Sequence, residues 1–168
     1  MMSSAVTLPN WLCAFALLAA AHVAPWWAGR TLGPRWAAPI DGGATLPDGH
    51  RLFGAHKTWR GLFASLALCT LLAPLLGHGA PLGAAFAALA MSADLASSFL
   101  KRRLNLAPGH EVPGVDQIPE ALVPLLVLAR PLGITPAMAT LLTGVFVLLD
   151  LAALPLRQRR QGETRGPH

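Results

Sequence analysis

Three polar side chains fall on one face of an otherwise apolar segment, close to its basic end. Asp94, Ser98 and Lys101 lie in the stretch ADLASSFLKRR, with Asp94 seven residues before Lys101. On a helix that rises about 1.5 Å per residue, the Asp94 carboxylate would lie about 10 Å inside the end of the segment, within about 40° of the other two side chains. An ionisable group there is costly and marks a candidate functional site. The alternative is that Asp94 only pairs with an Arg of a neighbouring loop.

A second cationic group occurs in the motif GAHKTWRG. Lys57, Thr58 and Arg60 resemble a fragment of a phosphate-binding P-loop, but a P-loop requires Gly directly before the Lys and another Gly five positions earlier. Those positions hold His56 and Arg51, so Walker-type ATPase chemistry is excluded. Lys57 and Arg60 could still clamp a polyphosphate, or they could simply be positive charge that flanks a membrane segment.

Two further carboxylates open the short apolar run that begins in GVDQIPEAL. Asp116 stands just ahead of a first-turn proline, as an ordinary helix N-cap does. Glu120 is four residues further and would share its face, so the pair can also be interpreted as a metal site aimed at the loop. Capping and metal binding do not exclude each other.

Asp150 lies seven residues before Arg157, at a depth similar to that of Asp94. It could share a cation with Asp94, or it could be neutralised by Arg130, Arg157 or a hydroxyl group. The histidines of the polar loops have no paired spacing of the kind that metal ligands show, and we interpret each of them as a loop residue: His50, His56 and His110.

The elements that position these residues are membrane-spanning helices. Of 168 residues, 54% are hydrophobic and 12% are charged, against roughly 25% charged in soluble domains. A helix needs about 20 apolar residues to cross the hydrocarbon core, which leaves room for about five spans in one all-α domain, residues 1–156. The expected spans are 6–27, 61–76, 79–100, 118–129 and 134–156, with polar loops at 28–60 and 101–117 and a basic tail at 157–168.

The Lys and Arg residues indicate the orientation of these spans. With five spans, the two polar loops and the tail lie on one side, and these three segments carry every Lys and Arg except Arg130. Positive charge collects in short cytoplasmic loops, so we expect that side to be the cytoplasm, with the N-terminus outside and the C-terminus inside. The basic residues interrupt apolar runs and form no stripe with aromatic residues, which disfavours a nucleic-acid partner.

The motifs PIDGG, DGHRLFGAHKTWRG, ADLASSFLKRR and the DQ of GVDQIPE resemble the CDP-archaeol synthase family in order and spacing, from about Pro39 to Glu120. That family consists of small five-helix membrane cytidylyltransferases related to phosphatidate cytidylyltransferases. The resemblance implies transfer of a cytidylyl group from CTP to a lipid phosphate, with Mg²⁺ as cofactor and a site that faces the cytoplasm of the cell membrane.

The resemblance also implies roles for individual residues. Asp94 and Asp116 would bind the metal and act with Lys101 in catalysis, with Glu120 as a further candidate ligand. The residues that would bind CTP and its phosphates are Lys57, Thr58, Arg60, Ser98, Arg102, Arg103, Asp41, Asp48 and Gly54.

One departure from the family pattern concerns the metal site. The archaeal pattern has a second Asp three residues after the first, and here that position holds Pro119. A non-catalytic membrane relative that binds nucleotide or anionic lipid is therefore the main alternative. A small transporter would place its ionisable residues near the bilayer midplane, whereas these cluster toward one end. The sequence leaves the lipid acceptor and the oligomeric state open.

Overall fold

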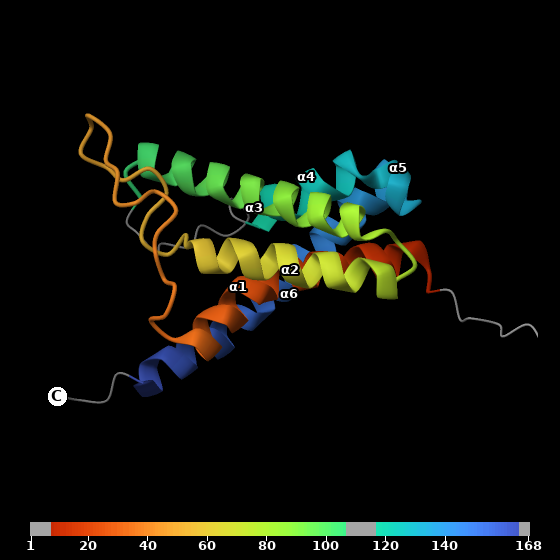
Figure 1. The fold of residues 1–168 in the computed structure, drawn as a ribbon, viewed down its shortest axis with the longest axis horizontal. Helices are drawn as coiled ribbons and strands as arrows, with labels where there is room; N and C mark the ends of the chain where they lie inside the picture. Colours follow the sequence, from red (N-terminus) through yellow and green to blue (C-terminus); the bar gives the residue numbers. More distant parts are fainter. Residues whose placement is uncertain (1–7, 107–116, 165–168) are drawn as a thin grey trace, which may run out of the picture.

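The computed structural model describes residues 8–106 and 117–164, with side chains described as far as residue 153. The described chain is all-helical apart from two isolated β-bridges in its long loop. The helices are α1 (Asn10–Leu32), α2 (Trp59–Leu75), α3 (Ala80–Arg103), α4 (Gln117–Val127), α5 (Ala129–Leu132) and α6 (Pro136–Thr164). They run side by side as an elongated bundle, with the loop between α1 and α2 at one end (Figure 1).

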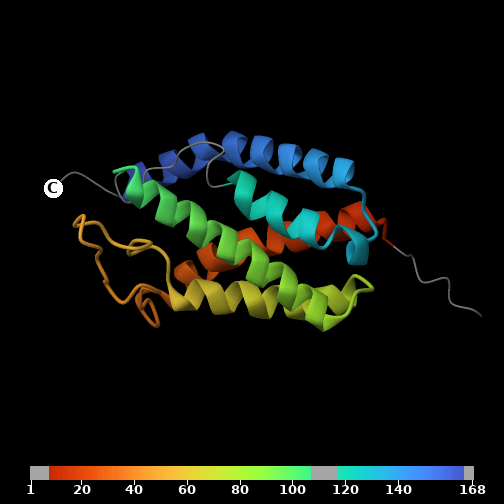
Figure 2. The ribbon, with the colours of Figure 1, turned by 90° about the horizontal axis from the view of Figure 1, so that it is seen from above.

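Neighbouring helices in the chain pack against each other in the bundle. The main contacts join α1 to α2, α2 to α3, α3 to α4 and α4 to α6. Figure 2 shows α6 along one edge of the bundle and α2 along the other, with α1, α3 and α4 between them; the loop between α1 and α2 and the C-terminal end of α3 lie at the same end. The two basic motifs, far apart in sequence, therefore belong to one end of the molecule.

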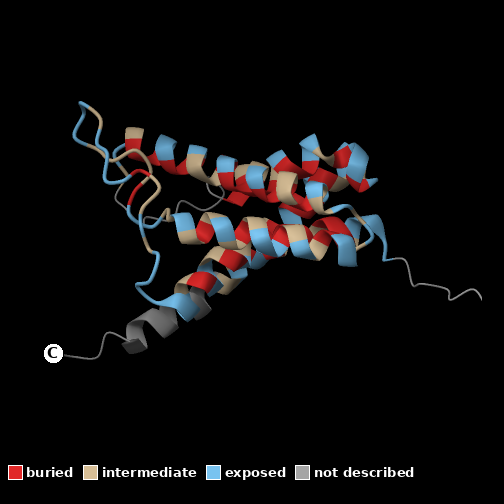
Figure 3. Ribbon diagram, in the orientation of Figure 1, coloured by how far each residue is buried: buried red, intermediate tan, exposed pale blue. Residues whose placement is uncertain are grey.

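Small residues let the helices approach closely, as they do in membrane bundles. The Ser65 hydroxyl donates to the carbonyl of Ala21 at 2.5 Å, which ties α2 to α1. Gly83 lies where α3 crosses α2, and a Cβ at this position would overlap the carbonyl oxygen of Cys69. The buried faces of the helices point inward (Figure 3). Cys13 and Cys69 are both buried and form no disulfide, so they serve as small packing residues.

The helices confirm an all-α membrane protein. In the described chain, α1, α3 and residues 136–153 of α6 are long and apolar enough to cross a bilayer, while α2 and α4 are shorter apolar helices. The five-span count and the orientation remain predictions. Three helices continue past the ends of their expected spans: α1 to Leu32, α3 to Arg103, and α6 to Thr164, within the segment expected to be a basic tail. A helix does not stop at the bilayer surface, because its backbone hydrogen bonds are internal and independent of the surrounding solvent.

Candidate active site

Asp41 organises the long loop between α1 and α2. Its carboxylate accepts hydrogen bonds from the backbone N–H groups of Gly43, Phe53 and Gly54, at 3.0, 3.2 and 3.0 Å, and pairs with the Arg51 guanidinium. Burial alone would raise the pKa of this carboxyl, but the Arg51 and backbone hydrogen bonds together hold the pKa well below its usual range. Asp41 therefore holds the loop in shape, and Gly54, at φ +106°, supplies a backbone conformation that other residues rarely adopt.

The end of this loop places Lys57 beside α3. The N–H of Ile40 donates to the Lys57 carbonyl at 2.8 Å, which fixes the backbone next to the start of α2. The Lys57 ammonium contacts both carboxylate oxygens of Asp94, at 2.6 and 2.5 Å. The side chains keep 27% and 17% exposure, so the pair is partly buried but open to small molecules.

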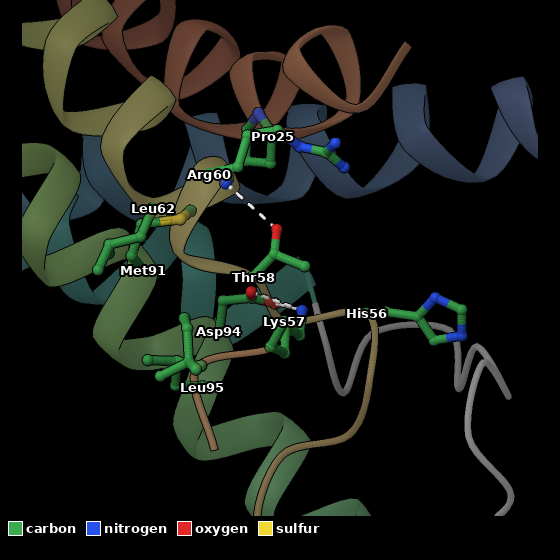
Figure 4. Close-up of a pocket in the computed structure, with 11 residues that line it drawn as sticks. Pro25, His56, Lys57, Thr58, Arg60, Leu62, Met91, Asp94 and Leu95 are labelled. Carbon is green, nitrogen blue, oxygen red and sulfur yellow. Dashed lines mark hydrogen bonds and ion pairs between the residues drawn. The ribbon is translucent and has the colours of Figure 1, made fainter. Parts of the chain in front are cut away.

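This ion pair lies in a pocket of about 120 Å³ between the loop and the helices. Figure 4 shows Lys57 and Asp94 pointing toward each other, with Thr58 and His56 on the loop side. The Thr58 hydroxyl caps α2 by accepting from the N–H of Gly61 at 3.3 Å. The pocket thus combines charged and apolar walls, and its lining residues are Pro25, Ile40, His56, Lys57, Thr58, Arg60, Gly61, Leu62, Met91, Asp94 and Leu95.

Arg60 lines the same pocket and ties the end of α1 to the start of α2. Its guanidinium donates to the carbonyls of Gly33 and Arg35, the latter at 3.1 Å. The cation is therefore held at the rim of the pocket by backbone oxygens and keeps its full positive charge, because carbonyls are neutral acceptors.

The second basic motif ends α3 beside the loop. Arg103 donates to the Asp48 carboxylate at 2.6 Å and to the carbonyls of His50 and Arg51 at 3.3 and 3.0 Å. The backbone N–H of His50 and the charge of Arg103 lower the pKa of Asp48, although its slight burial acts in the opposite direction. Asp48 and Arg103 thus fasten the loop to α3.

Comparison with known proteins places the chain among membrane lipid enzymes. A family model described as CarS-like, CDP-archaeol synthase, matches residues 80–154. A protein of Pyrococcus furiosus named CDP-archaeol synthase is 39% identical over 128 residues, which cover 70% of this chain and 72% of the relative. The chain belongs to the CDP-archaeol synthase family. This membership confirms the resemblance seen in the motifs and the predicted enzyme class, a CTP-dependent lipid-phosphate cytidylyltransferase.

A second curated relative and a solved structure are similar to this member of the CDP-archaeol synthase family. The protein of that name from Aeropyrum pernix is 38% identical over 122 residues, which cover 68% of this chain and 70% of the relative. A solved structure described as an intramembrane enzyme for archaeal membrane lipids biosynthesis has a TM-score of 0.67 and 33% identity, and the match covers 84% of this chain and 90% of that one.

The structure brings some of the predicted site residues together in one pocket. Lys57, Thr58, Arg60 and Asp94 share the pocket. Three other predicted residues are buried near the same end of α3 but do not line the pocket: Ser98, Lys101 and Arg102. Asp116, the second predicted metal ligand, lies outside the described residues.

Glu120 points elsewhere. It contacts the Nδ1 atom of His22 at 3.1 and 3.2 Å, and it is not among the residues that line the pocket. Among the described residues, no group of three or more His, Cys, Asp or Glu side chains has an arrangement that could hold a metal ion by itself. A role for Glu120 as a metal ligand remains a prediction.

Sequence reasoning missed His22. We considered the loop histidines, but His22 lies in the first apolar run, where its ring contacts Glu120 and its Nε2 lies 3.2 Å from Asp150. Asp150 also accepts from the Gln117 side chain at 2.9 Å. The available signal was simple: a polar ring in a membrane-spanning segment is costly and therefore needs polar partners.

Proposed function

We propose that this protein activates a membrane lipid phosphate with CTP at the loop end of its bundle, and that Mg²⁺ is required. The observation that supports this site best is the Lys57–Asp94 ion pair, which lies in an open pocket with Thr58 and Arg60 beside it. A triphosphate needs cations to hold it and a carboxylate to help bind a divalent ion. The pocket offers both within one small volume.

The proposed reaction is an in-line displacement at phosphorus. An anionic oxygen of the lipid phosphate attacks the α-phosphorus of CTP, the bond from that phosphorus to the bridging oxygen breaks, and pyrophosphate leaves with the bonding electrons. No strong general base is needed, because the attacking oxygen is already ionised. Positioning and charge neutralisation then supply most of the catalysis.

Lys57 and Arg60 would bind the phosphates in this reaction. Asp94 holds the Lys57 ammonium in the pocket, so the cation is in position before the nucleotide arrives. Arg60 is held at the rim by carbonyls that leave its charge uncompensated. Lys101 and Arg102 are buried at the same end of α3, and Ser98 lies one turn before Lys101. We propose that the two cations and the Ser98 hydroxyl complete the surroundings of the leaving pyrophosphate.

Asp94 and Asp116 would hold the metal ion. The donor chemistry of Asp94 fits Mg²⁺, which takes hard oxygen ligands and is usually bound by one or two carboxylates together with substrate phosphates. A bound Mg²⁺ would neutralise charge on the triphosphate and on the departing pyrophosphate. Asp41 and Asp48 would act indirectly, because their carboxylates are engaged in holding the loop that carries Lys57.

The position of the site suggests its orientation. The long loop and the basic end of α3 lie at one end of the bundle (Figure 1), and the pocket is lined in part by residues of that loop and of α3. Short loops rich in Lys and Arg face the cytoplasm in membrane proteins. We therefore propose a multi-pass protein of the cell membrane whose nucleotide site opens to the cytoplasm, where CTP is available.

The test is product formation by the purified protein in lipid vesicles. Labelled CTP and Mg²⁺ are supplied with a panel of acceptors, and both CDP-lipid and pyrophosphate are measured. The names of the relatives make an archaeol-type lipid phosphate the first acceptor to test, beside diacyl phosphatidic acid. Equal amounts of CDP-lipid and pyrophosphate are expected with at least one acceptor.

One observation favours a second candidate, a non-catalytic relative that binds nucleotide. Pro119 stands where the archaeal pattern has an Asp, which removes one potential metal ligand. CTP binding without CDP-lipid from any acceptor would support that candidate and contradict the enzymatic proposal.

A further inference from the structure

A buried polar cluster joins three helices behind the pocket. His22 of α1 lies between Glu120 of α4 and Asp150 of α6: Nδ1 is 3.1 Å from one Glu120 oxygen, and Nε2 is 3.2 Å from Asp150 Oδ1. The two carboxylates are almost fully enclosed, with side-chain exposures of 6% and 4%. Gln117 donates to Asp150 at 2.9 Å, a hydrogen bond that links α4 directly to α6.

The cluster is close to the proposed nucleotide site. His22 is three residues before Pro25 on α1, one helical turn from a wall of the pocket. Glu120 is near enough to interact electrostatically with both Asp94 and Lys57. A charge on Glu120 is therefore felt by the ion pair that carries the proposed chemistry.

His22 is suited to cancel that charge. An ionised carboxylate carries no proton, so a ring whose two nitrogens each lie within ion-pair distance of such a carboxylate is best matched by a proton on both nitrogens, which is the imidazolium form. A buried carboxylate that loses its cationic partner is strongly unfavourable. Phe146 of α6 packs edge-on against the imidazole, with ring centroids 5.0 Å apart, and holds its orientation.

We propose that His22 is a positioning residue for the nucleotide site. It fixes the first turn of α4 through Glu120 and binds α6 through Asp150. It also keeps the Glu120 charge from acting on the Lys57–Asp94 pair and from repelling the triphosphate. Because Gln117 directly follows Asp116 in the chain, the same contacts set where the chain enters α4. This inference rests on the proposed function for the identity of the ligand.

The experiment compares His22→Ala with the double variant His22→Ala/Glu120→Gln. His78→Ala, in the turn between α2 and α3 at the opposite end of the bundle, is the matched control. CTP affinity is measured by equilibrium dialysis with labelled CTP and Mg²⁺ and no lipid acceptor, beside KM, kcat and the melting temperature. Removing a group that supports a binding residue typically costs about tenfold or more in affinity.

The expected result is a loss of about tenfold in CTP affinity and a matching rise in KM for His22→Ala. The change in kcat is smaller, because the lost interaction acts on binding. Glu120→Gln in the same chain restores most of the affinity, because the uncompensated charge is gone. His78→Ala behaves as the wild type does.

Three results would overturn the proposal. One is wild-type affinity in His22→Ala with only a lower melting temperature, which describes a purely structural residue. Another is equal loss in the single and double variants, which removes the charge of Glu120 as the cause. If His22→Ala does not fold, His22→Gln is used; it retains a polar group without positive charge, and unchanged affinity in it also contradicts the proposal.

The binding measurement separates this inference from the proposed function. If the wild type binds CTP but forms no CDP-lipid, the proposed function fails while the affinities of the variants still decide the role of His22. If the wild type binds no CTP, both proposals fall.

Discussion

Lys57 donates to both carboxylate oxygens of Asp94, at 2.6 and 2.5 Å, and so joins the end of the long loop to α3. The two residues are 37 positions apart in the chain. Because the pair lies in the pocket with partial exposure, it can exchange partners when a phosphate and a cation arrive together. The proposals above centre on this relationship, and the first prediction follows from it.

Replacing Lys57 with Met removes the ammonium and keeps much of the side-chain volume. We expect kcat/KM for CTP to fall by about 10²–10³-fold, the usual loss when one preorganised donor of a charged transition state is removed. Lys57→Arg keeps the charge but changes its shape, so an intermediate value is expected. Steady-state kinetics in vesicles give the comparison. Activity of Lys57→Met within about twofold of the wild type would exclude Lys57 from the site.

Metal dependence is the second prediction. Treatment with a chelator should abolish CDP-lipid formation, and added Mg²⁺ should restore it. Asp116→Asn should raise the Mg²⁺ concentration needed for half-maximal rate by about tenfold or more, because one hard oxygen ligand is lost. Glu120→Gln tests the other candidate ligand separately: an unchanged Mg²⁺ dependence removes Glu120 from the metal site, and a raised Mg²⁺ requirement places it there.

The third prediction concerns pH and the loop. The pKa of Asp41 is lower in the folded protein than in an unfolded chain, so its ionised form stabilises the fold above the ordinary value of about 3.9. That contribution is lost as the pH falls through the lowered folded pKa. The melting temperature in detergent should therefore fall between pH 5 and strongly acidic pH, and fall less steeply in Asp41→Asn. Parallel curves for the two proteins would contradict the role of Asp41 in the loop.

The fourth prediction tests the packing of α3 on α2. An added Cβ at Gly83 would overlap the carbonyl of Cys69 and come 2.8 Å from the Cβ of Ala73. Gly83→Ala should destabilise the fold by about 1–3 kcal/mol through overpacking, seen as a lower melting temperature. Gly144→Ala is the control, because nothing lies within 4 Å of a Cβ there. Equal melting temperatures for the two variants would show that the close approach is not rigid.

The membrane class could be predicted from the sequence for a physical reason, and so could four of the residues that line the pocket: Lys57, Thr58, Arg60 and Asp94. Apolar runs of span length are read directly from composition, and the cationic motifs stand out against them. Asp94 was expected to be functional or to pair with a loop Arg; the structure pairs it with Lys57 of that loop. Whether Lys57 or an Arg of the loop reaches Asp94 depends on the path of the loop backbone. Hydrogen bonds in the turns, such as those to Asp41, set that path.

The contacts of the interior were harder to predict. For Asp150 the sequence left two alternatives open, a cation shared with Asp94 or neutralisation by Arg130, Arg157 or a hydroxyl. It did not predict the contacts with His22 and Gln117 that the structure shows. Helical periodicity describes which residues share a face of one helix, but it does not state which helices are neighbours. The approach of α1, α4 and α6 is a property of tertiary packing, so the His22 cluster is visible only in the folded chain.

Asp94→Asn tests the central claim most directly. This variant keeps the size of the side chain and removes its charge, and Glu163→Gln in the basic tail is the matched control for loss of a carboxylate. CDP-lipid formed from α-labelled CTP is measured in vesicles with Mg²⁺ and the best acceptor, after equal folding is shown by melting temperature. The account predicts loss of at least about 10²-fold in Asp94→Asn and full activity in Glu163→Gln. Wild-type rates in Asp94→Asn would contradict it.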